Sequence, residues 1–185
     1  MTPLETALLE VVDHLQRHRI PFMVIGGAAI NLWGNTRSTK DVDVSVWVAD
    51  DDLEKCVHSM VAVFPARIAN PVEFARTRRI LLLQTPAGID VDISLALLPF
   101  EQEAIRRAPV KLLHGREVKV GSVTDLVILK AIAGRPQDEI DLQFLISRYG
   151  SEIDRKTLDR KIGELAQALS RPELEAQYIR CWKSP

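Results

Sequence analysis

An alternating stretch, Asp41-Val42-Asp43-Val44, constrains the fold of this chain more than any other feature. The alternation continues through two more pairs, which predicts a β-strand over 41–48 with valine side chains on one face. Side chains at i and i+2 of a strand point to the same side. The two carboxylates therefore share the other face, with Cα atoms roughly 6.5–7 Å apart.

A glycine pair, Gly26-Gly27, stands upstream of these aspartates. It follows a short apolar run, residues 22–25, which predicts a buried strand. The pair is expected to close this strand and to open a short helix over 28–33. Glycines at such a turn can bring backbone N–H groups close to a phosphate chain, because they carry no Cβ atom.

Aspartates on an alternating strand can also lie at a sheet edge and simply face water. A second acidic strand, which contains Asp90 and Asp92, favours a shared site. If the two strands are neighbours, a third carboxylate joins Asp41 and Asp43. Such hard oxygen ligands suit Mg²⁺ bound together with substrate phosphates. Two cations about 3.5–4 Å apart support in-line nucleotidyl displacement. Spacing alone does not separate Asp90 from Asp92, since both lie on one strand face.

Lys130 is the only charged residue in the apolar run 126–133, which is predicted to be helical. A lysine in this position either extends its ammonium group to water or contacts a fixed anion. Two further residues, Arg37 and Thr39, flank the first acidic strand. They form an ordinary polar loop or contact phosphate or the acceptor.

Asp138 and Asp141 lie one turn apart near the start of a predicted helix. We expect them to cap that helix or to pair with Arg135 rather than to bind a metal. Six basic residues could line a groove for an RNA acceptor, although charge clusters of this kind are more often solvated. These are Arg76, Arg78, Arg79, Arg106, Arg107 and Lys111.

The order of predicted elements indicates an α+β fold. A small mixed sheet packed by helices is followed by a C-terminal helical segment. A length of 185 residues suits one domain with a helical appendage. We expect a core over residues 1–120 and a helical region over 121–185 packed on that core.

The composition excludes several classes of protein. A net charge of −1 gives no bulk argument for strong nucleic-acid binding. Cys56 and Cys181 fit no metal-binding spacing and are expected to be reduced thiols. No apolar run approaches the roughly 18 residues that span a membrane, and the start of the chain does not read as a signal peptide. The sequence therefore predicts a cytoplasmic protein with no membrane partner.

In this order, the motifs resemble the DNA-polymerase-β-like nucleotidyltransferase superfamily. Within it, the chain is most similar to the AbiEii-like and MenT-type nucleotidyltransferase toxins of type IV toxin–antitoxin systems. The resemblance covers about residues 20–145, and residues 150–185 are not matched. The matching stretches are Ile25–Ala29, Arg37–Asp43, Val91–Ile93 followed by Pro99–Glu101, and Asp125–Leu142.

The resemblance implies transfer of a nucleotide from an NTP to an acceptor hydroxyl, with pyrophosphate leaving. Asp41 and Asp43 would hold two Mg²⁺ ions. Asp92 would bind the catalytic ion and assist deprotonation of the acceptor. Gly26 and Gly27 would contact the triphosphate, as would Lys130. Gly27 stands where many members have serine, so a hydroxyl contact to phosphate is missing and the following helix N-terminus must contribute more.

The resemblance also implies an RNA acceptor, in particular a tRNA 3′ end, and a neighbouring antitoxin that restrains the enzyme. Two alternatives remain open. The acceptor could be a small molecule such as an antibiotic, or a protein side chain. The chain could also be a non-catalytic nucleotide-binding module on the same fold. The sequence does not fix the nucleotide base or the oligomeric state.

Overall fold

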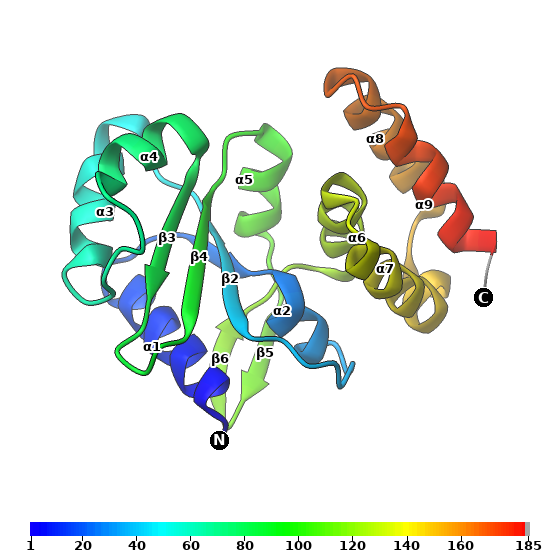
Figure 1. The fold of residues 1–185 in the computed structure, drawn as a ribbon. Helices are drawn as coiled ribbons and strands as arrows, with labels where there is room; N and C mark the ends of the chain where they lie inside the picture. The colour runs from blue at the N-terminus through cyan, green and yellow to red at the C-terminus, as the bar shows by residue number, and fades with distance from the viewer. Residues whose placement is uncertain (184–185) are drawn as a thin grey trace. The chain divides into compact units, whose positions relative to one another are not determined.

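The computed structural model describes residues 1–183, and the chain divides into two compact units, Met1–Gly121 and Ser122–Pro185 (Figure 1). Within the described residues, the first unit contains both β-sheets, and the second contains helices alone. A small mixed sheet packed by helices, followed by a helical segment, confirms the predicted α+β class.

The larger sheet has the strand order β1-β2-β4-β3, so the last strand in sequence lies between the second and the third. β2 and β4 pair in parallel, whereas the two outer pairs are antiparallel. A separate hairpin pairs β5 with β6. The strands are β1 (Phe22–Val24), β2 (Asp41–Val46), β3 (Ile80–Gln84), β4 (Asp90–Leu95), β5 (Val110–Leu113) and β6 (Arg116–Lys119).

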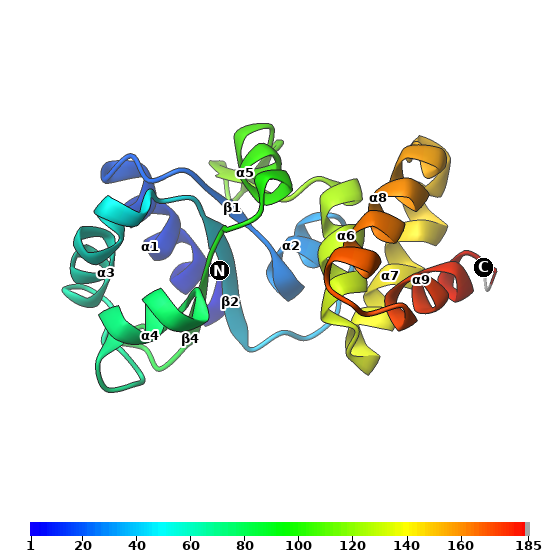
Figure 2. The same cartoon turned by 90° about the horizontal axis from the view of Figure 1, so that it is seen from above.

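The valine face of β2 belongs to the core of the first unit. Its three valines are fully buried, whereas the aspartates that alternate with them are partly exposed. Figure 2 shows α1 (Pro3–Arg17) and α3 (Leu53–Val61) on one side of the sheet and α2 (Gly26–Leu32) on the other. The alternation in the sequence therefore separates a packed face from an accessible acidic face.

The start of α1 follows from its sequence. The Thr2 side chain accepts a hydrogen bond from the backbone of Glu5, and the Glu5 carboxylate accepts one from the backbone of Thr2 at 2.6 Å. This capping box satisfies two N–H groups that a helix start would leave unpaired. Leu8, Val12 and Leu15 are buried from the same helix.

The structure differs from the sequence-based expectations in two boundaries and one additional helix. α2 begins at Gly26 rather than Ala28, because the glycine pair forms the first turn instead of preceding it. β2 ends at Val46, two residues before the end of the alternation. A helix between the predicted elements, α4 (Pro71–Arg78), was not anticipated, although Pro at its first position is a usual start signal. The helix α5 (Pro99–Arg106) follows β4.

Residues 65–67 pair with the outer edge of β3 and so widen the larger sheet. Ala66 bridges to Leu83 in antiparallel fashion, and the backbone N–H of Arg67 donates to the carbonyl of Leu82 at 2.9 Å. The backbone of Arg67, the residue after this bridge, is therefore held at the edge of the sheet.

The second unit is a group of helices, and none of the helices in the described residues has the length and apolarity to cross a membrane. Gly134, with φ of +66°, ends the first of them, and the next starts with Pro136. The α-helices are α6 (Val123–Ala133), α7 (Pro136–Tyr149), α8 (Arg155–Ala168) and α9 (Glu173–Lys183).

Candidate active site

Parallel pairing of β2 with β4 brings four aspartates onto one face of the sheet. Asp41 is the Cα partner of Asp90, and Asp43 is the Cα partner of Asp92. Neighbouring strands lie about 4.8 Å apart, and paired residues point to the same side. Asp92 therefore lies on the same face as Asp41 and Asp43, in the row that contains Asp43.

Asp43 is packed against the glycine turn. Gly26 has φ of +63°, and a Cβ atom at that position would collide with the carboxylate of Asp43. The backbone N–H of Ile25 also donates to the carbonyl of Asp43 at 2.9 Å. Glycine is therefore required at position 26 for two reasons: the backbone is left-handed, and the Asp43 carboxylate leaves no room for a Cβ atom.

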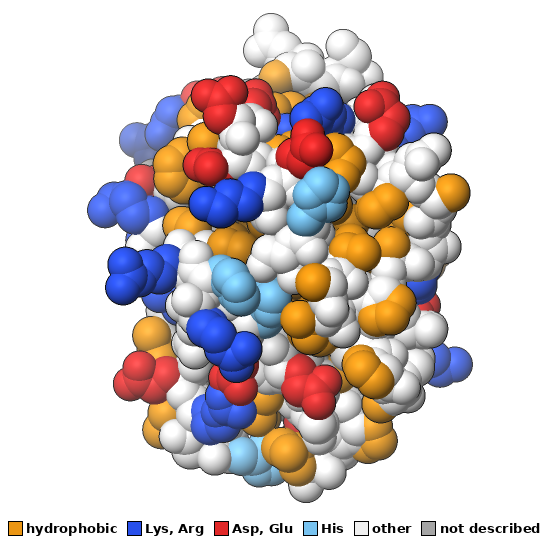
Figure 3. Space-filling view, turned by 90° about the vertical axis from the view of Figure 1, so that its left-hand side faces the viewer, with side chains coloured by type: hydrophobic (Ala, Val, Ile, Leu, Met, Phe, Trp, Pro, Cys, Tyr) orange, Lys and Arg blue, Asp and Glu red, His pale blue; other side chains and the backbone are white. Residues whose placement is uncertain are grey.

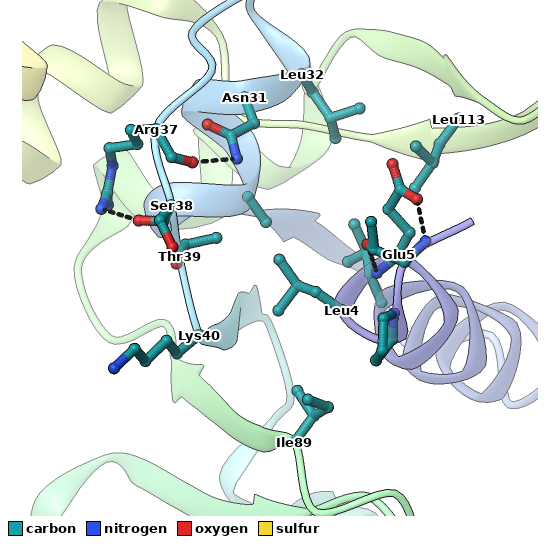
Figure 4. Close-up of a pocket in the computed structure, with 14 residues that line it drawn as sticks. Leu4, Glu5, Asn31, Leu32, Arg37, Ser38, Thr39, Lys40, Ile89 and Leu113 are labelled. Carbon is teal, nitrogen blue, oxygen red and sulfur yellow. Dashed lines mark hydrogen bonds between the residues drawn. The ribbon is translucent and has the colours of Figure 1, made fainter.

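The loop before β2 closes over the second glycine. A Cβ atom at Gly27 would lie 2.5 Å from Thr39 Oγ1 and 2.6 Å from Arg37 Nη2. Thr39 Oγ1 donates to Asp41 Oδ1 at 2.8 Å. The carbonyl of Arg37 accepts from Asn31 Nδ2 at 3.0 Å (Figure 4). The structure thus brings Gly27, Arg37, Thr39 and Asp41 together at the start of α2.

Arg67 enters the acidic face from the sheet edge, and sequence reasoning missed it. Its Nη1 donates to Asp90 Oδ2 at 3.0 Å, and its Nη2 donates to Asp92 Oδ1. Nothing in the local sequence distinguishes this arginine. Its position depends on residues 65–67 pairing with β3, and a single bridge of this kind leaves no periodic signal.

The surroundings of Asp92 act on its carboxyl group in opposite directions. Burial raises the pKa of Asp92, the Arg67 guanidinium opposes this increase, and the negative charges of Asp41 and Asp90 add to it. The net pKa lies above the usual aspartate value. The contribution from Asp41 comes from the neighbouring strand, so the two acids are close enough to interact electrostatically.

The donor set of this face suits a divalent cation, although the acids are engaged with protein partners. Among residues 1–183, no group of three or more His, Cys, Asp or Glu side chains is gathered closely enough to hold a metal ion. Mg²⁺ is commonly held by one or two carboxylates together with substrate phosphates and waters. A site completed by the phosphates of an NTP therefore fits carboxylates presented in this register.

Lys130 belongs to the second unit, where it is buried between two aspartates. Its Nζ lies 2.8 Å from Asp138 Oδ1 and 2.8 Å from Asp141 Oδ2. Both carboxylates are fully buried. Arg135 Nε donates to Asp138 at 2.7 Å, so pairing of Asp138 with Arg135 is observed as expected. The predicted contact of Lys130 with the triphosphate stays a prediction.

Some of the arginines considered for an RNA groove are paired with acids. Arg76 Nη2 lies 2.9 Å from Glu54, and Arg79 Nη1 lies 3.0 Å from Asp50. Figure 3, which shows the side of the molecule that lies at the left in Figure 1, has basic, acidic and hydrophobic side chains on one face. These pairs reduce the charge available to a phosphate backbone.

A hollow of about 550 Å³ lies beside the loop that carries Arg37 and Thr39 (Figure 4). Lys40, Asn31 of α2 and Leu4 of α1 also line it. None of the three candidate catalytic aspartates is in its lining. The hollow therefore adjoins the candidate nucleotide-binding loop without forming part of the acidic face.

Comparison with known proteins identifies both a family and a fold. A family model described as nucleotidyl transferase of unknown function (DUF2204) matches residues 4–180. A search of curated proteins found no significant match.

Three solved structures illustrate the shared fold, at sequence identities of 14–18%. The antibiotic-resistance factor ANT(2″)-Ia gives a TM-score of 0.62 at 15% identity, covering 91% of this chain and 96% of its own. An antigenic nucleotidyltransferase-like protein from Paracoccidioides brasiliensis gives 0.56 at 18%, covering 95% and 91%. The lincosamide antibiotic adenylyltransferase LnuA gives 0.53 at 14%, covering 80% and 98%. The fold is that of the polymerase-β-like nucleotidyltransferases.

Proposed function

The chain belongs to this family of nucleotidyl transferases, and we propose that its acidic face transfers a nucleoside monophosphate from an NTP to an acceptor hydroxyl. The observation that carries the proposal is the pairing of Asp43 with Asp92 beside the turn at Gly26. Two acids therefore lie side by side in one row of the sheet, and the carboxylate of one of them packs against the backbone of the glycine turn.

The proposed roles follow from these positions. Together with the phosphates of the NTP, Asp41, Asp43 and Asp92 would hold divalent cations, expected to be two Mg²⁺ ions, which would neutralise the charge of the phosphates. The N-cap of α2, Ile25, provides no side-chain hydrogen bond, so N–H groups of the first turn of α2 are offered to the triphosphate. In the reaction, the acceptor oxygen forms a bond to the α-phosphorus and pyrophosphate departs. The acceptor proton passes to Asp92.

Arg37 and Thr39 support the nucleotide side of the site. Thr39 fixes one oxygen of Asp41, and Arg37 lies against Gly27. We assign both residues to holding the loop and the phosphates beside the glycine turn. Lys130 remains assigned to the triphosphate through the resemblance of its motif alone.

We favour a small hydroxyl-bearing molecule as the acceptor. ANT(2″)-Ia is an antibiotic-resistance factor and LnuA is a lincosamide antibiotic adenylyltransferase, both of comparable fold, and the match to the first covers 91% of this chain. The net charge of −1 and the arginines paired with acids also favour a small acceptor over an RNA backbone.

RNA is the second candidate acceptor. The ordered motifs from Gly26 to Asp141 resemble those of the toxin-like branch, for which a tRNA 3′ end and an antitoxin partner are expected. If the acceptor is RNA, transfer should weaken steeply as the salt concentration rises. Transfer to a small uncharged acceptor should depend much less on salt.

One experiment separates these acceptors. The protein is incubated with each of the four α-³²P-labelled NTPs and Mg²⁺, with an aminoglycoside, a lincosamide or total tRNA as acceptor. Label on an antibiotic supports the first candidate, and label on tRNA supports the second. Label that appears equally with an Asp43→Asn protein would show that the acidic face is not the site of transfer.

A further inference from the structure

Arg67 occupies the same cross-strand row as the two paired aspartates. Ala66 bridges to Leu83, so Arg67 stands opposite Leu82, and Leu82 is the Cα partner of Asp92. Asp92 in turn is the partner of Asp43. The row therefore reads Arg67, Leu82, Asp92, Asp43 across the sheet, and the guanidinium passes over a leucine to reach the acids.

The two acids of β4 differ in how many of their oxygens are engaged. Asp90 accepts from Gln84 Nε2 at 2.9 Å through Oδ1, and from Arg67 Nη1 at 3.0 Å through Oδ2. Asp92 accepts from Arg67 Nη2 through Oδ1. Within residues 1–183, no side chain or backbone group is found hydrogen-bonded to Oδ2 of Asp92. Only Asp92 retains an oxygen that protein groups do not use.

We propose that Arg67 is a positioning residue that, anchored by Asp90, orients Asp92 and leaves its Oδ2 for the nucleotide-bound cation. The proposal rests on the function proposed above and extends it, because it assigns Asp92 as the third ligand and Asp90 as the anchor of the arginine. A planar guanidinium can bridge two carboxylates with its two terminal nitrogens, which an ammonium group does not reproduce.

Loss of hydrogen bonds to metal-ligating groups commonly costs 10–100-fold in metal affinity or activity. Whether cation binding becomes stronger or weaker when Arg67 is replaced shows whether this arginine acts through its charge or by positioning Asp92. Removing a positive charge near a cation site should strengthen cation binding, because repulsion is lost. Removing a positioning residue should weaken it. Arg67→Gln therefore separates the two explanations by sign.

The test measures Mn²⁺ binding to the full chain by electron paramagnetic resonance, without nucleotide and again with a non-hydrolysable NTP analogue. The variants are Arg67→Gln, Arg67→Lys, Asp90→Asn, Asp92→Asn and the Arg67→Lys/Asp90→Asn pair. Arg76→Lys, at an exposed arginine paired with Glu54, is the matched control. Thermal unfolding checks that each variant is folded.

We expect both Arg67 variants to weaken Mn²⁺ binding about 10-fold or more, while Arg76→Lys has no effect. Asp92→Asn should be more damaging than Asp90→Asn. Asp90→Asn should cost less in the Arg67→Lys background than in the parent chain, because its anchoring role is already lost.

Either of two results would overturn the role of Arg67 while leaving the proposed function intact. One is tighter or unchanged Mn²⁺ binding by Arg67→Gln together with unchanged binding by Arg67→Lys. The other is a larger loss from Asp90→Asn than from Asp92→Asn. If the parent chain binds Mn²⁺ no better than an Asp43→Asn protein, both the proposed cation site and the role of Arg67 are wrong.

Discussion

Asp43 and Asp92 are Cα partners on adjacent parallel strands, although α3, α4 and β3 separate them along the chain. This pairing brings two distant positions in the sequence into one row of the sheet, the row proposed to bind cations. It also makes the acidic face sensitive to changes at residues that set the register or that press against either carboxylate.

Replacing Asp43 with asparagine should reduce nucleotidyl transfer on the order of 100-fold or more, because a charged ligand is lost while the shape is kept. The measurement is transfer of labelled NMP under saturating NTP. Asp51→Asn, at an exposed aspartate of the 3₁₀ helix Asp50–Asp52, is the matched control and should retain full activity. Equal losses in both variants would contradict the assignment.

Gly26→Ala should be more destabilising than Gly88→Ala. Both glycines have positive φ, +63° and +80°, so each substitution carries a left-handed backbone cost of about 1–2 kcal/mol. At Gly88 the new methyl group meets open space, whereas at Gly26 it collides with Asp43. Overpacking adds about 1–3 kcal/mol at Gly26 alone.

Urea unfolding of the two glycine variants measures the difference. Transfer activity should fall only in Gly26→Ala, since this methyl group displaces the Asp43 carboxylate. If Gly88→Ala loses as much stability and activity as Gly26→Ala, the close contact between Gly26 and Asp43 is not present in solution.

Lys130→Met should destabilise the second unit by about 3–5 kcal/mol, because two buried aspartates would lose the ammonium group between them, while Arg135 still contacts Asp138. Lys156→Met, at an exposed position of α8, is the control and should change the unfolding free energy by less than about 0.5 kcal/mol. Chemical denaturation followed by circular dichroism gives both values. An unchanged unfolding free energy in Lys130→Met would show that the ammonium group does not compensate these acids.

The same cluster should make the unfolding free energy depend on pH. Burial alone would raise the pKa of Asp138, but hydrogen bonds from Arg135 and Lys130 outweigh it and hold the pKa below the usual value. A depressed pKa in the folded state contributes stability above the unfolded pKa of about 3.9. That contribution should be lost as the pH falls below about 4, and it should be absent from Asp138→Asn.

Cys56 should react slowly with iodoacetamide in the folded protein. Burial raises the pKa of its thiol to about 11, so at pH 8 only about one thiol in a thousand is ionised. A thiol with an ordinary pKa of about 8.5 is roughly one-quarter ionised. We therefore expect labelling to be more than about 100-fold slower than in urea, as measured by peptide mass spectrometry.

The sign of the linked stability effect is opposite to that of Asp138. The unfolded thiol ionises first, so the unfolding free energy should decrease as the pH rises from about 8.5 toward 11. Labelling of Cys56 in the native chain at the rate seen in urea would contradict its burial.

Much of the fold could be predicted because local signals were strong. The alternation from Asp41 onward specified a strand with two unlike faces, and the capping box at Thr2 specified the start of α1. The glycine pair marked a turn, although a positive φ at Gly26 within the first helical turn could not be inferred from residue type alone.

The rest of the site depends on pairing between segments that are distant in sequence. Asp90 and Asp92 are equivalent in spacing, and they are distinguished by the strand register, which pairs Asp92 with Asp43, and by the contacts of Arg67 and Gln84. Arg67 itself is placed by a single bridge beside β3. Such long-range backbone pairing has no local periodicity, so the sequence provided no signal for this arginine.

The position of β4 between two earlier strands has a consequence for synthesis. β2 and β3 are made first, yet they do not pair with each other, and the sheet closes only after β4 has entered the gap between them. Parallel strands joined by a long crossover close slowly, because chain entropy is lost before the contacts form. A nascent chain that ends before Asp90 therefore lacks both the strand that joins β2 to β3 and the carboxylate of Asp92.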